Sequence, residues 1–587
     1  MCKPFCRFIA PYLLLFSLIG LTAACASSSS PDELILADSS SATLPDTKAD
    51  SPPEVEPGIS AAPVVEALEP TSGPAEASDV PLSAEPASAG GVEVAAIAPT
   101  CPEPDLFQAG RICFIGIGGN TLVHPISMAS NGESVWLLDG GRLLNVSLRN
   151  PSEPAVMLKP GDMIDGVPVQ EPFDLALVDG GLLVLDRVGD VYRFDFDDGM
   201  WTHDRYARPI GETSSHYYVS LATNGFDRYL LETSYRYGLR YLPNQAETGW
   251  AVPEDVVLID LAVGDPLPGG ESVAYLLQRP LDIDSGGERT EIIRYINGVP
   301  DLNFRPQAEI RRGRELQVGP TAVYLLDKAG FRLTVFNKEN GTVLTQTEFL
   351  YPISTFSLHL DQFGSSLLTY AGRNAIYLPG QPDNKHVIET TQTLPHPQPH
   401  DLAVWEGLPD FVLPILNLPV DRKELRLPGA PRHYRQGIHQ GMDFYWGPGR
   451  EVLASASGTV IRAMVNYQPP STNDFIRWRA ETNSLGFTSP EALDFYRGRQ
   501  VWIEHENGYV SRYAHLSQID PATVEGATVT QGQRIGAVGN SGSPGSLEGP
   551  DVDSHLHYEL WIGDHYFGQY LRPVEVRELV EGLFINR

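Results

Sequence analysis

The chain has 587 residues, a formal net charge of −32, and five cysteines. Its length is sufficient for more than one folded domain. The acidic balance argues against binding to the phosphate backbone of nucleic acids, so we expect no nucleic-acid partner.

The first 24 residues are predicted to be a secretory signal. Two basic residues precede an apolar run over positions 12–21, and small residues come before Cys25. The five residues ending at Cys25 resemble a bacterial lipoprotein cleavage box, with Thr22 where that box prefers Leu. This resemblance implies an exported protein anchored to the membrane through a lipidated Cys25. An ordinary signal peptide is the alternative, and the apolar run is shorter than the roughly 20 residues that span a bilayer.

Residues 25–100 are rich in Ser, Ala, Pro, Glu and Asp, and Lys48 is the only basic residue among them. Such a segment buries too little apolar surface to offset its chain entropy, which predicts a disordered, extended tether. Cys101 and Cys113 follow. In an exported chain this pair is expected to form a disulfide, and two free thiols are the alternative.

An internal repeat is present within residues 101–410. A short apolar strand recurs at intervals of about 42 to 49 residues, which is the range of four-stranded propeller blades. The repeated strands are Trp136–Asp139, Leu183–Asp186, Tyr229–Glu232, Tyr275–Gln278, Tyr324–Asp327 and Ser366–Thr369. A second strand precedes several of them, and glycine turns follow, so the pattern predicts a β-propeller. Asp401–Val404 and a strand near Cys113 could complete a seventh blade. Six and seven blades therefore stay open, and a pair of β-sandwiches is the alternative.

Histidines and carboxylates gather near the C-terminus in a pattern suited to a hydrolytic zinc site. Zinc in a catalytic site takes three protein ligands and leaves the fourth position to water. Five candidate groups are enough for three ligands and two side chains that handle protons. The candidates are His439, Asp443, His515, His555 and His557.

The last of these stretches is predicted to be a strand. Apolar residues at positions 556, 558 and 560 alternate with His555, His557 and Glu559, so both histidines lie on one face. His439 and Asp443 stand in a glycine-interrupted run without a helical period, and we expect them on a strand or loop. A lone histidine in a strand is most simply a satisfied polar group, but the complete ordered set favours a metal site.

These motifs resemble the lysostaphin-type (LytM-type) zinc endopeptidases of bacterial cell walls. The family patterns are His-x3-Asp, a His in a Tyr-x-His-Leu context, and His-x-His followed by an aromatic residue and Glu. All three are present in order, and Gln531–Gly542 resembles the family's glycine-rich segment. The resemblance covers roughly the last 160 residues, about one domain. It implies a β-rich fold, like a duplicated hybrid motif, for residues 411–587.

Carried over residue by residue, the resemblance implies that His439, Asp443 and His557 bind Zn2+ and that His515 and His555 are catalytic. Zinc lowers the pKa of bound water toward about 7, while a neutral imidazole can take a proton and a protonated one can stabilise an oxyanion. Which histidine has which role stays open at this point.

Two insertions distinguish the chain from compact members of that family. Residues 463–498 are long enough to carry structure of their own, and Ser489–Arg499 is predicted to be a capped helix. The second insertion is Ser543–Asp553, and both are expected to form walls of a substrate groove. Val501–Val510 is predicted to be a hairpin with an Asn-Gly turn, in which His505 is structural. Val452–Ile461 is predicted to form paired short strands.

The chain is therefore expected to be mainly β, with a signal (1–24), a tether (25–100), a six- or seven-bladed propeller (101–410) and a peptidase domain (411–587). The first functional hypothesis is an exported metalloendopeptidase that hydrolyses peptide bonds of bacterial peptidoglycan. The second is a non-catalytic cell-wall-binding or regulatory lipoprotein, in which the propeller recruits a protein or glycan partner. The complete set of ligand positions favours the first.

Overall fold

The computed structural model describes residues 110–115, 122–151, 154–204, 216–225, 228–233, 237–241, 248–253, 256–281, 288–372, 375–378, 385–389, 405 and 408–585. The predicted signal, the tether, Cys25 and Cys101 lie outside these ranges. Within them, no helix combines the length and apolar character needed to cross a membrane.

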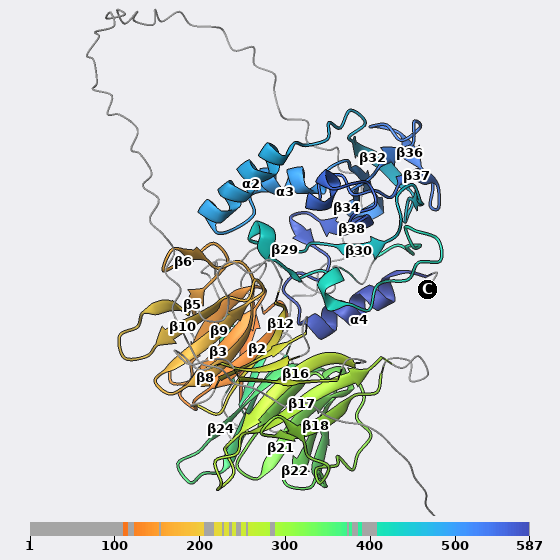
Figure 1. Cartoon of the computed structure of the whole chain (residues 1–587). Coiled ribbons are helices and arrows are strands. Elements are labelled where there is room, and N and C mark those ends of the chain that lie inside the picture. Colours follow the sequence, from red (N-terminus) through yellow and green to blue (C-terminus); the bar gives the residue numbers. More distant parts are fainter. Residues whose placement is uncertain are drawn as a thin grey trace, which may run out of the picture. The chain divides into compact units, whose positions relative to one another are not determined.

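Six sheets account for the described strands between residues 110 and 389, apart from the short pair β6 (Met163–Ile164) and β7 (Val167–Pro168) (Figure 1). Their strand pairs are antiparallel, except for one parallel pair in the sixth sheet. The first three sheets contain β2 (Pro125–Ser130), β3 (Ser134–Asp139), β4 (Arg142–Ser147) and β5 (Ala155–Leu158); β8 (Pro172–Val178), β9 (Gly181–Asp186), β10 (Val191–Asp195) and β11 (Trp201–Asp204); and β12 (Tyr218–Thr223), β13 (Arg228–Glu232), β14 (Tyr237–Tyr241) and β15 (Thr248–Ala251).

The next two sheets have the same order of four strands. They contain β16 (Val256–Gly264), β17 (Val273–Pro280), β18 (Glu291–Ile296) and β19 (Val299–Pro300); and β20 (Glu315–Val318), β21 (Ala322–Asp327), β22 (Arg332–Asn337) and β23 (Val343–Glu348), with the 3-10 helix η3 (Lys328–Gly330) between β21 and β22. The sixth sheet has five strands in the order β24 (Ile353–Leu360), β25 (Ser366–Gly372), β26 (Ala375–Leu378), β1 (Gly110–Ile115) and β27 (Lys385–Glu389).

The sequence repeat is confirmed strand by strand. Each of the six repeated apolar segments is the second strand of its sheet, from β3 to β25. These strands are apolar because they lie between neighbours in the sheet and are packed on both faces. In β9, for example, every residue from Gly181 to Asp186 is buried. The first strands of successive sheets lie beside one another, and β24 contacts β2. This is the arrangement of a six-bladed β-propeller.

The sixth sheet decides between six and seven blades for the described residues. The strand around Cys113 is β1, and it pairs with β26 and β27 in the sixth sheet rather than opening a further blade. The prediction that the strand near Cys113 could form part of a seventh blade is therefore wrong, because this strand, β1, completes the sixth sheet. Asp401–Val404 lies outside the described residues. Cys113 is disulfide-bonded, and its pairing with Cys101 stays a prediction.

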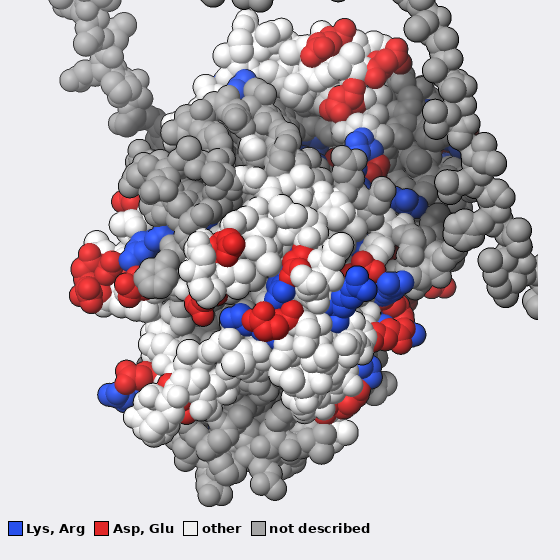
Figure 2. Space-filling model, turned by 60° about the horizontal axis from the view of Figure 1, so that its bottom comes forward, with Lys and Arg blue, Asp and Glu red and all other residues white. Residues whose placement is uncertain are grey.

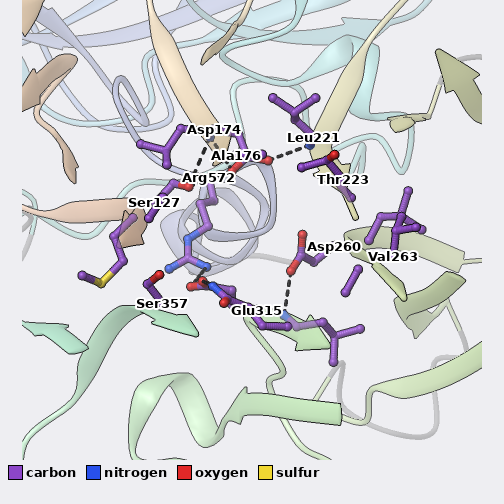
Figure 3. Close-up of a pocket in the computed structure, with 18 of the residues that line it drawn as sticks. Ser127, Asp174, Ala176, Leu221, Thr223, Asp260, Val263, Glu315, Ser357 and Arg572 are labelled. Atoms are coloured by element: carbon purple, nitrogen blue, oxygen red, sulfur yellow. Dashed lines mark hydrogen bonds and ion pairs between the residues drawn. The ribbon is translucent and has the colours of Figure 1, made fainter. Parts of the chain in front are cut away.

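Side chains on the first strands connect neighbouring sheets. The Ser127 hydroxyl donates to Asp174 Oδ1 at 2.8 Å, and Asp174 Oδ2 accepts from the Leu221 amide at 2.7 Å, so one carboxylate joins three sheets. Asp260 makes the equivalent bonds to the strands on either side of β16. The first strands surround a cavity of about 230 Å³ (Figure 3). Buried polar groups of this kind are stable because their hydrogen bonds are satisfied.

The C-terminal part of the chain reaches this cavity through Arg572, which caps helix α4 (Pro573–Leu583). Its guanidinium donates to Glu315 Oε2 at 3.3 Å and to the Arg314 carbonyl oxygen at 3.2 Å (Figure 3). Burial raises the pKa of Glu315 to about 8, against the opposing effect of Arg572, and raises that of Asp174 to about 7. The cationic side chain from α4 thus lies among carboxylates of the propeller.

The C-terminal part is built on a seven-stranded antiparallel sheet. Its strand order is β30 (Met442–Tyr445), β38 (His555–Ile562), β34 (Tyr509–Ala514), β33 (Val501–Glu504), β32 (Gly458–Ala463) and β36 (Thr528–Val529), with β39 (His565–Tyr566) paired to β38. A three-stranded sheet contains β31 (Glu451–Leu453), β37 (Arg534–Ala537) and β35 (Gln518–Ile519), and β28 (Pro431–Arg432) pairs with β29 (Gly437–Ile438). The remaining 3-10 helices are η4 (Glu424–Arg426), η5 (His433–Arg435), η6 (Glu506–Gly508) and η7 (Pro544–Leu547).

The predicted insertion over residues 463–498 folds as two helices, α2 (Thr472–Leu485) and α3 (Pro490–Arg497). The expected cap is present, since the Ser489 hydroxyl accepts from the Ala492 amide at 3.1 Å. The hairpin of β33 and β34 is also confirmed, with Asn507 and Gly508 at positive φ in its turn. The pairing predicted within Val452–Ile461 is wrong, because β31 pairs with β37 while β32 pairs with β33 and β36.

A buried ion pair lies where the propeller meets the C-terminal sheets. Glu171 accepts hydrogen bonds from the Tyr566 hydroxyl at 2.6 Å and from the Tyr570 amide at 2.9 Å. Its carboxylate lies 3.4 Å from Arg187 Nε, and both side chains are at most 2% exposed. Arg187 also donates to the Tyr217 hydroxyl. Because a buried charge is stable only when paired, this contact fixes the two parts of the chain together.

The surface seen in Figure 2 carries charges of both signs. Blue and red residues lie near one another across this face, separated by uncharged residues. The basic residues on this face are thus interspersed with acidic ones.

We expect Glu171→Ala to lower the free energy of unfolding by about 3–5 kcal/mol, because Arg187 would remain buried without its carboxylate. The matched control is Glu133→Ala, which removes an exposed pair with Arg149 and should cost less than about 1 kcal/mol. Urea unfolding of the three proteins measures both effects. Equal losses for the two substitutions would contradict the role assigned to the buried pair.

Candidate metal centre

Two adjacent strands bring the predicted ligands together. In the antiparallel pair of β30 and β38, Asp443 lies directly opposite His557. His439 is in the loop that leads into β30, and Gly441 allows this loop to approach β38. A Cβ atom on Gly441 would lie 2.4 Å from the Tyr558 carbonyl oxygen, closer than real contacts allow. The glycine between the two motif residues is therefore required by packing.

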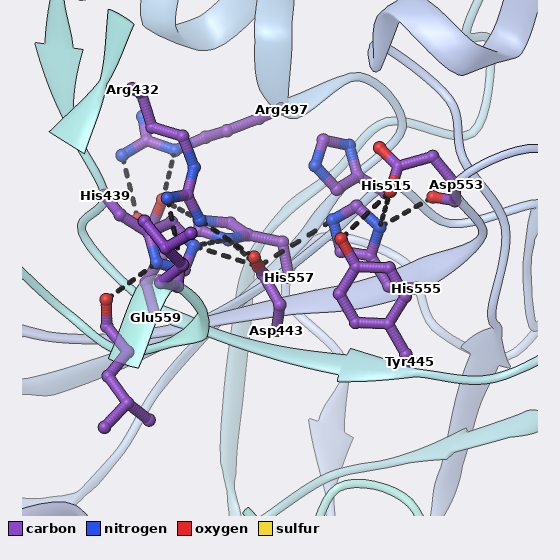
Figure 4. Close-up of polar contacts among 12 residues, drawn as sticks. Arg432, His439, Asp443, Tyr445, Arg497, His515, Asp553, His555, His557 and Glu559 are labelled. Carbon is purple, nitrogen blue, oxygen red and sulfur yellow. Dashed lines mark hydrogen bonds and ion pairs between the residues drawn. The ribbon is translucent and has the colours of Figure 1, made fainter. Parts of the chain in front are cut away.

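The three ligand atoms form a compact triangle. His439 Nε2, Asp443 Oδ1 and His557 Nδ1 lie 2.9 Å from one another (Figure 4). Tetrahedral zinc with bonds of about 2.0–2.1 Å separates its ligand atoms by about 3.3 Å. An increase of a few tenths of an ångström in each separation would thus give the spacing of tetrahedral zinc ligands. All three side chains are buried.

Hydrogen bonds on the far side of each ring determine which nitrogen faces the centre. His439 Nδ1 lies 2.9 Å from the Leu427 carbonyl oxygen, which can only accept, so its proton is on Nδ1. His557 Nε2 lies 2.8 Å from Glu559 Oε1 and donates to that carboxylate. Burial, together with the nearby Arg432, lowers the pKa of His439 to about 3 and keeps it neutral.

The lone pairs of His439 Nε2 and Asp443 Oδ1 therefore point at the centre of the triangle, and His557 Nδ1 faces the same centre. Such an arrangement is repulsive unless a cation or a proton lies among the three atoms. Burial opposes charge on His557, but its hydrogen bonds to the Asp443 and Glu559 carboxylates raise its pKa. A proton can occupy the centre in the absence of metal, and a divalent cation fits the same donor set.

Second partners hold the ligands in orientation. Arg432 Nη2 donates to Asp443 Oδ2 at 2.9 Å, which leaves Oδ1 available to a metal ion. Glu559 is fully buried and accepts from Arg497 Nε at 2.9 Å and from the Trp561 indole N–H at 2.6 Å. Although burial opposes its charge, Arg497 holds the pKa of Glu559 well below its usual value. An ionised Glu559 beside His557 makes that imidazole a stronger metal ligand.

His515 and His555 lie beside the ligands rather than among them. Their ring centroids are 4.7 Å apart, and that of His515 is 5.7 Å from the His557 ring. His515 Nδ1 donates to the Ser541 carbonyl oxygen at 2.7 Å, and His555 Nδ1 donates to that of Asp553 at 2.7 Å. Each ring thus keeps Nε2 for the cleft. The backbone of His515 has a φ of 60°, a strained conformation typical of functional positions.

Tyr445 and Asp553 position the His555 ring. The Tyr445 ring stacks on His555 at a centroid distance of 4.7 Å, and its hydroxyl donates to Asp553 Oδ1 at 2.9 Å (Figure 4). The Arg426 guanidinium lies over the other face of this layer, 3.7 Å from the Tyr445 centroid. The Tyr445 ring therefore stacks with both Arg426 and His555.

A cleft of about 480 Å³ opens over this centre. Both predicted insertions contribute to its wall, as expected: Leu493, Tyr496 and Arg497 come from the first, and Ser543, Pro544, Gly545 and Asp553 from the second. His505 lies elsewhere, where it contacts the Ser457 carbonyl oxygen and the Ser511 hydroxyl. The five predicted site residues all line the cleft.

The supporting roles of several site residues were missed from the sequence. Glu559 stands two positions after His557 on the same strand face, and that spacing could have identified it as the partner of His557. Arg432 and Tyr445 carried no such signal, since their places depend on the pairing of β30 with β38 and on the turn before His439.

Comparisons with known proteins agree with this geometry. Residues 437–569 match peptidase family M23. The peptidoglycan DD-endopeptidase ShyA of Vibrio cholerae is 34% identical to this chain over 128 residues, which are 22% of this chain and 21% of that protein. ShyC, a peptidoglycan DD-endopeptidase of the same organism, is 35% identical over 77 residues, 13% of this chain and 16% of that protein. This chain thus spans about a fifth of the length of these relatives.

Two solved structures are also similar to parts of the chain. The catalytic domain of the M23 protein EnpA from Enterococcus faecalis matches with 22% identity and a TM-score of 0.15, over 23% of this chain and 76% of that one. Virginiamycin B lyase from Staphylococcus aureus matches with 12% identity and a TM-score of 0.26, over 45% of this chain and 88% of that one. His439, Asp443 and His557 all lie inside the matched region, and residues 437–569 of this chain form a domain of peptidase family M23.

Proposed function

We propose that this protein is an exported zinc metalloendopeptidase that hydrolyses peptide bonds of bacterial peptidoglycan. The observation that carries the proposal is the convergence of His439, Asp443 and His557, with His515 and His555 facing the same cleft. The names of the similar Vibrio cholerae enzymes support this substrate. The N-terminal signal pattern and Cys25 support export and attachment to the membrane, with the enzyme facing the cell envelope or exterior.

A zinc ion held by the three ligands would act as a Lewis acid and lower the pKa of a bound water. His515 is suited to accept the proton of that water. Burial, reinforced by the neighbouring His555 and His557, holds the pKa of His515 well below its usual value, so the ring is neutral. Its Nδ1 proton is committed to Ser541, which leaves the Nε2 lone pair as the base.

His555 is suited to the complementary role. Its Nδ1 donates to the Asp553 carbonyl oxygen, so a second proton on Nε2 makes the ring a donor toward the cleft. A donor there can stabilise the oxyanion formed at the peptide carbonyl, and Tyr445 keeps the ring in place.

The propeller then has two roles, to hold the peptidase domain and to bind a protein or glycan partner.

We expect the wild type to contain one zinc per chain and to release muropeptides from purified sacculi. His557→Ala should lose both properties, because it removes a ligand. His515→Ala should keep the zinc and lower the rate by about 10²- to 10⁴-fold, because it removes the base. His359→Ala, in β24 of the propeller, is the matched control and should behave as wild type. Metal analysis and mass spectrometry of the released fragments measure these outcomes.

Two results would contradict this assignment. Zinc-loaded wild type that is no faster than His557→Ala would favour the non-catalytic wall-binding hypothesis. Loss of zinc from His515→Ala would show that His515 is a ligand rather than a base.

We expect Glu559→Gln to weaken zinc affinity by about 10- to 100-fold, because His557 would lose a charged partner. Competition with a chromophoric chelator measures the affinity. Glu525→Gln removes an acid of the same domain outside the cleft lining and serves as the control. An unchanged affinity in Glu559→Gln would show that the carboxylate does not act through the metal ligand.

A further inference from the structure

The cleft over the metal centre is basic, although the whole chain is strongly acidic. The formal net charge of the chain is −32. Five basic side chains line the cleft, against the carboxylates of Asp443 and Asp553. The basic residues are Lys423, Arg426, Arg432, Arg435 and Arg497. Since the metal would add positive charge, the cleft is suited to an anionic ligand.

Three of these basic groups have carboxylate partners within the described chain. Arg432 pairs with Asp443, and Arg497 pairs with Glu559. Arg426 pairs with Asp421. Lys423 is exposed at the edge of the cleft. Its backbone, rather than its ammonium group, bonds to Asp421.

Arg435 differs from the others because it is buried and its partners are neutral. Arg435 is 5% exposed. Nη1 donates to the Thr488 hydroxyl at 3.1 Å and Nη2 donates to the Ile438 carbonyl oxygen at 2.8 Å. No carboxylate in the described part of the chain forms an ion pair with it. Buried charges are normally paired, since an unpaired one is costly.

The surrounding structure holds Arg435 rigidly at the cleft. It ends the short helix η5, in which His433 Nε2 donates to the propeller carbonyl oxygen of Val188 at 2.8 Å. The following residue, Gln436, accepts a hydrogen bond from Gln170 of the propeller through its carbonyl oxygen. Thr488, between α2 and α3, holds the guanidinium from the other side. A rigidly placed guanidinium can bind a planar anion with little loss of entropy.

We propose that Arg435 binds a carboxylate of the peptide substrate next to the scissile bond. This inference rests on the proposed function and specifies the substrate as an acidic peptide. A guanidinium has five N–H donors, of which the hydrogen bonds to Thr488 and Ile438 use two. A charge-assisted hydrogen bond from another of them to a carboxylate is stronger than one to a neutral carboxamide. Lys423 at the rim adds a second, solvated positive charge. The aromatic rings of Tyr434 and Tyr496, 5.7 Å apart, flank the same cleft.

The test uses cross-linked stem peptides in which one free carboxylate at a time is replaced by a carboxamide. For wild type, one replacement should lower kcat/KM by about tenfold or more, mainly by raising KM, which is the range for one charge-assisted hydrogen bond. Arg435→Gln keeps donors for Thr488 and Ile438 but has no charge. It should cleave the acid and the amide at equal rates, while Arg435→Lys should keep part of the preference.

Arg534→Gln, an exposed arginine of the same domain, is the matched control and should keep the wild-type preference. Zinc content and thermal unfolding check that Arg435→Gln is folded and loaded. Equal cleavage of all the peptides by wild type would overturn the inference, whatever the variants do. A preference that survives in folded Arg435→Gln would also overturn it. Failure of wild type to cleave any peptide or sacculus would instead contradict the proposed function itself.

Discussion

The antiparallel pairing of β30 with β38 is the constraint on which the site depends. It places Asp443 opposite His557 and Tyr445 opposite His555, so one register sets two of the three candidate metal ligands and the ring that stacks on His555. A slip of one residue would send these side chains to the other face of the sheet. The buried apolar residues on the reverse face, such as Leu556 and Tyr558, make that slip unfavourable because they would enter the cleft.

The propeller contributes to the site through the segments that it holds. Glu171 and the cavity around Arg572 attach the C-terminal sheets and α4, while Val188 and Gln170 hold the turn that precedes His439. A metal centre needs its ligands and their supporting groups to be placed by rigid elements. The propeller is therefore part of the structure that orients the basic wall of the cleft.

Local patterns predicted much of this protein. Period-two alternation gave the β38 strand and its histidine face, and the repeated apolar segments gave the second strand of each of six blades, although they left six and seven blades open. Long-range pairing was less accessible: β1 joins a sheet whose other strands lie over 200 residues away, and β31 pairs with β37 rather than with β32. Arg432 and Arg435 were missed for the same reason, because their roles arise only where η5, the helical insertion and the metal ligands meet.

The central claim is that two imidazoles and one carboxylate hold a zinc ion in a tetrahedral site. X-ray absorption at the zinc edge, on the wild type loaded with one equivalent of zinc, tests it most directly. The account predicts a four-coordinate ion with nitrogen and oxygen neighbours at about 2.0–2.1 Å, including scattering from two imidazole rings. A six-coordinate ion surrounded by water, or a spectrum with the signature of fewer than two imidazoles, would contradict it.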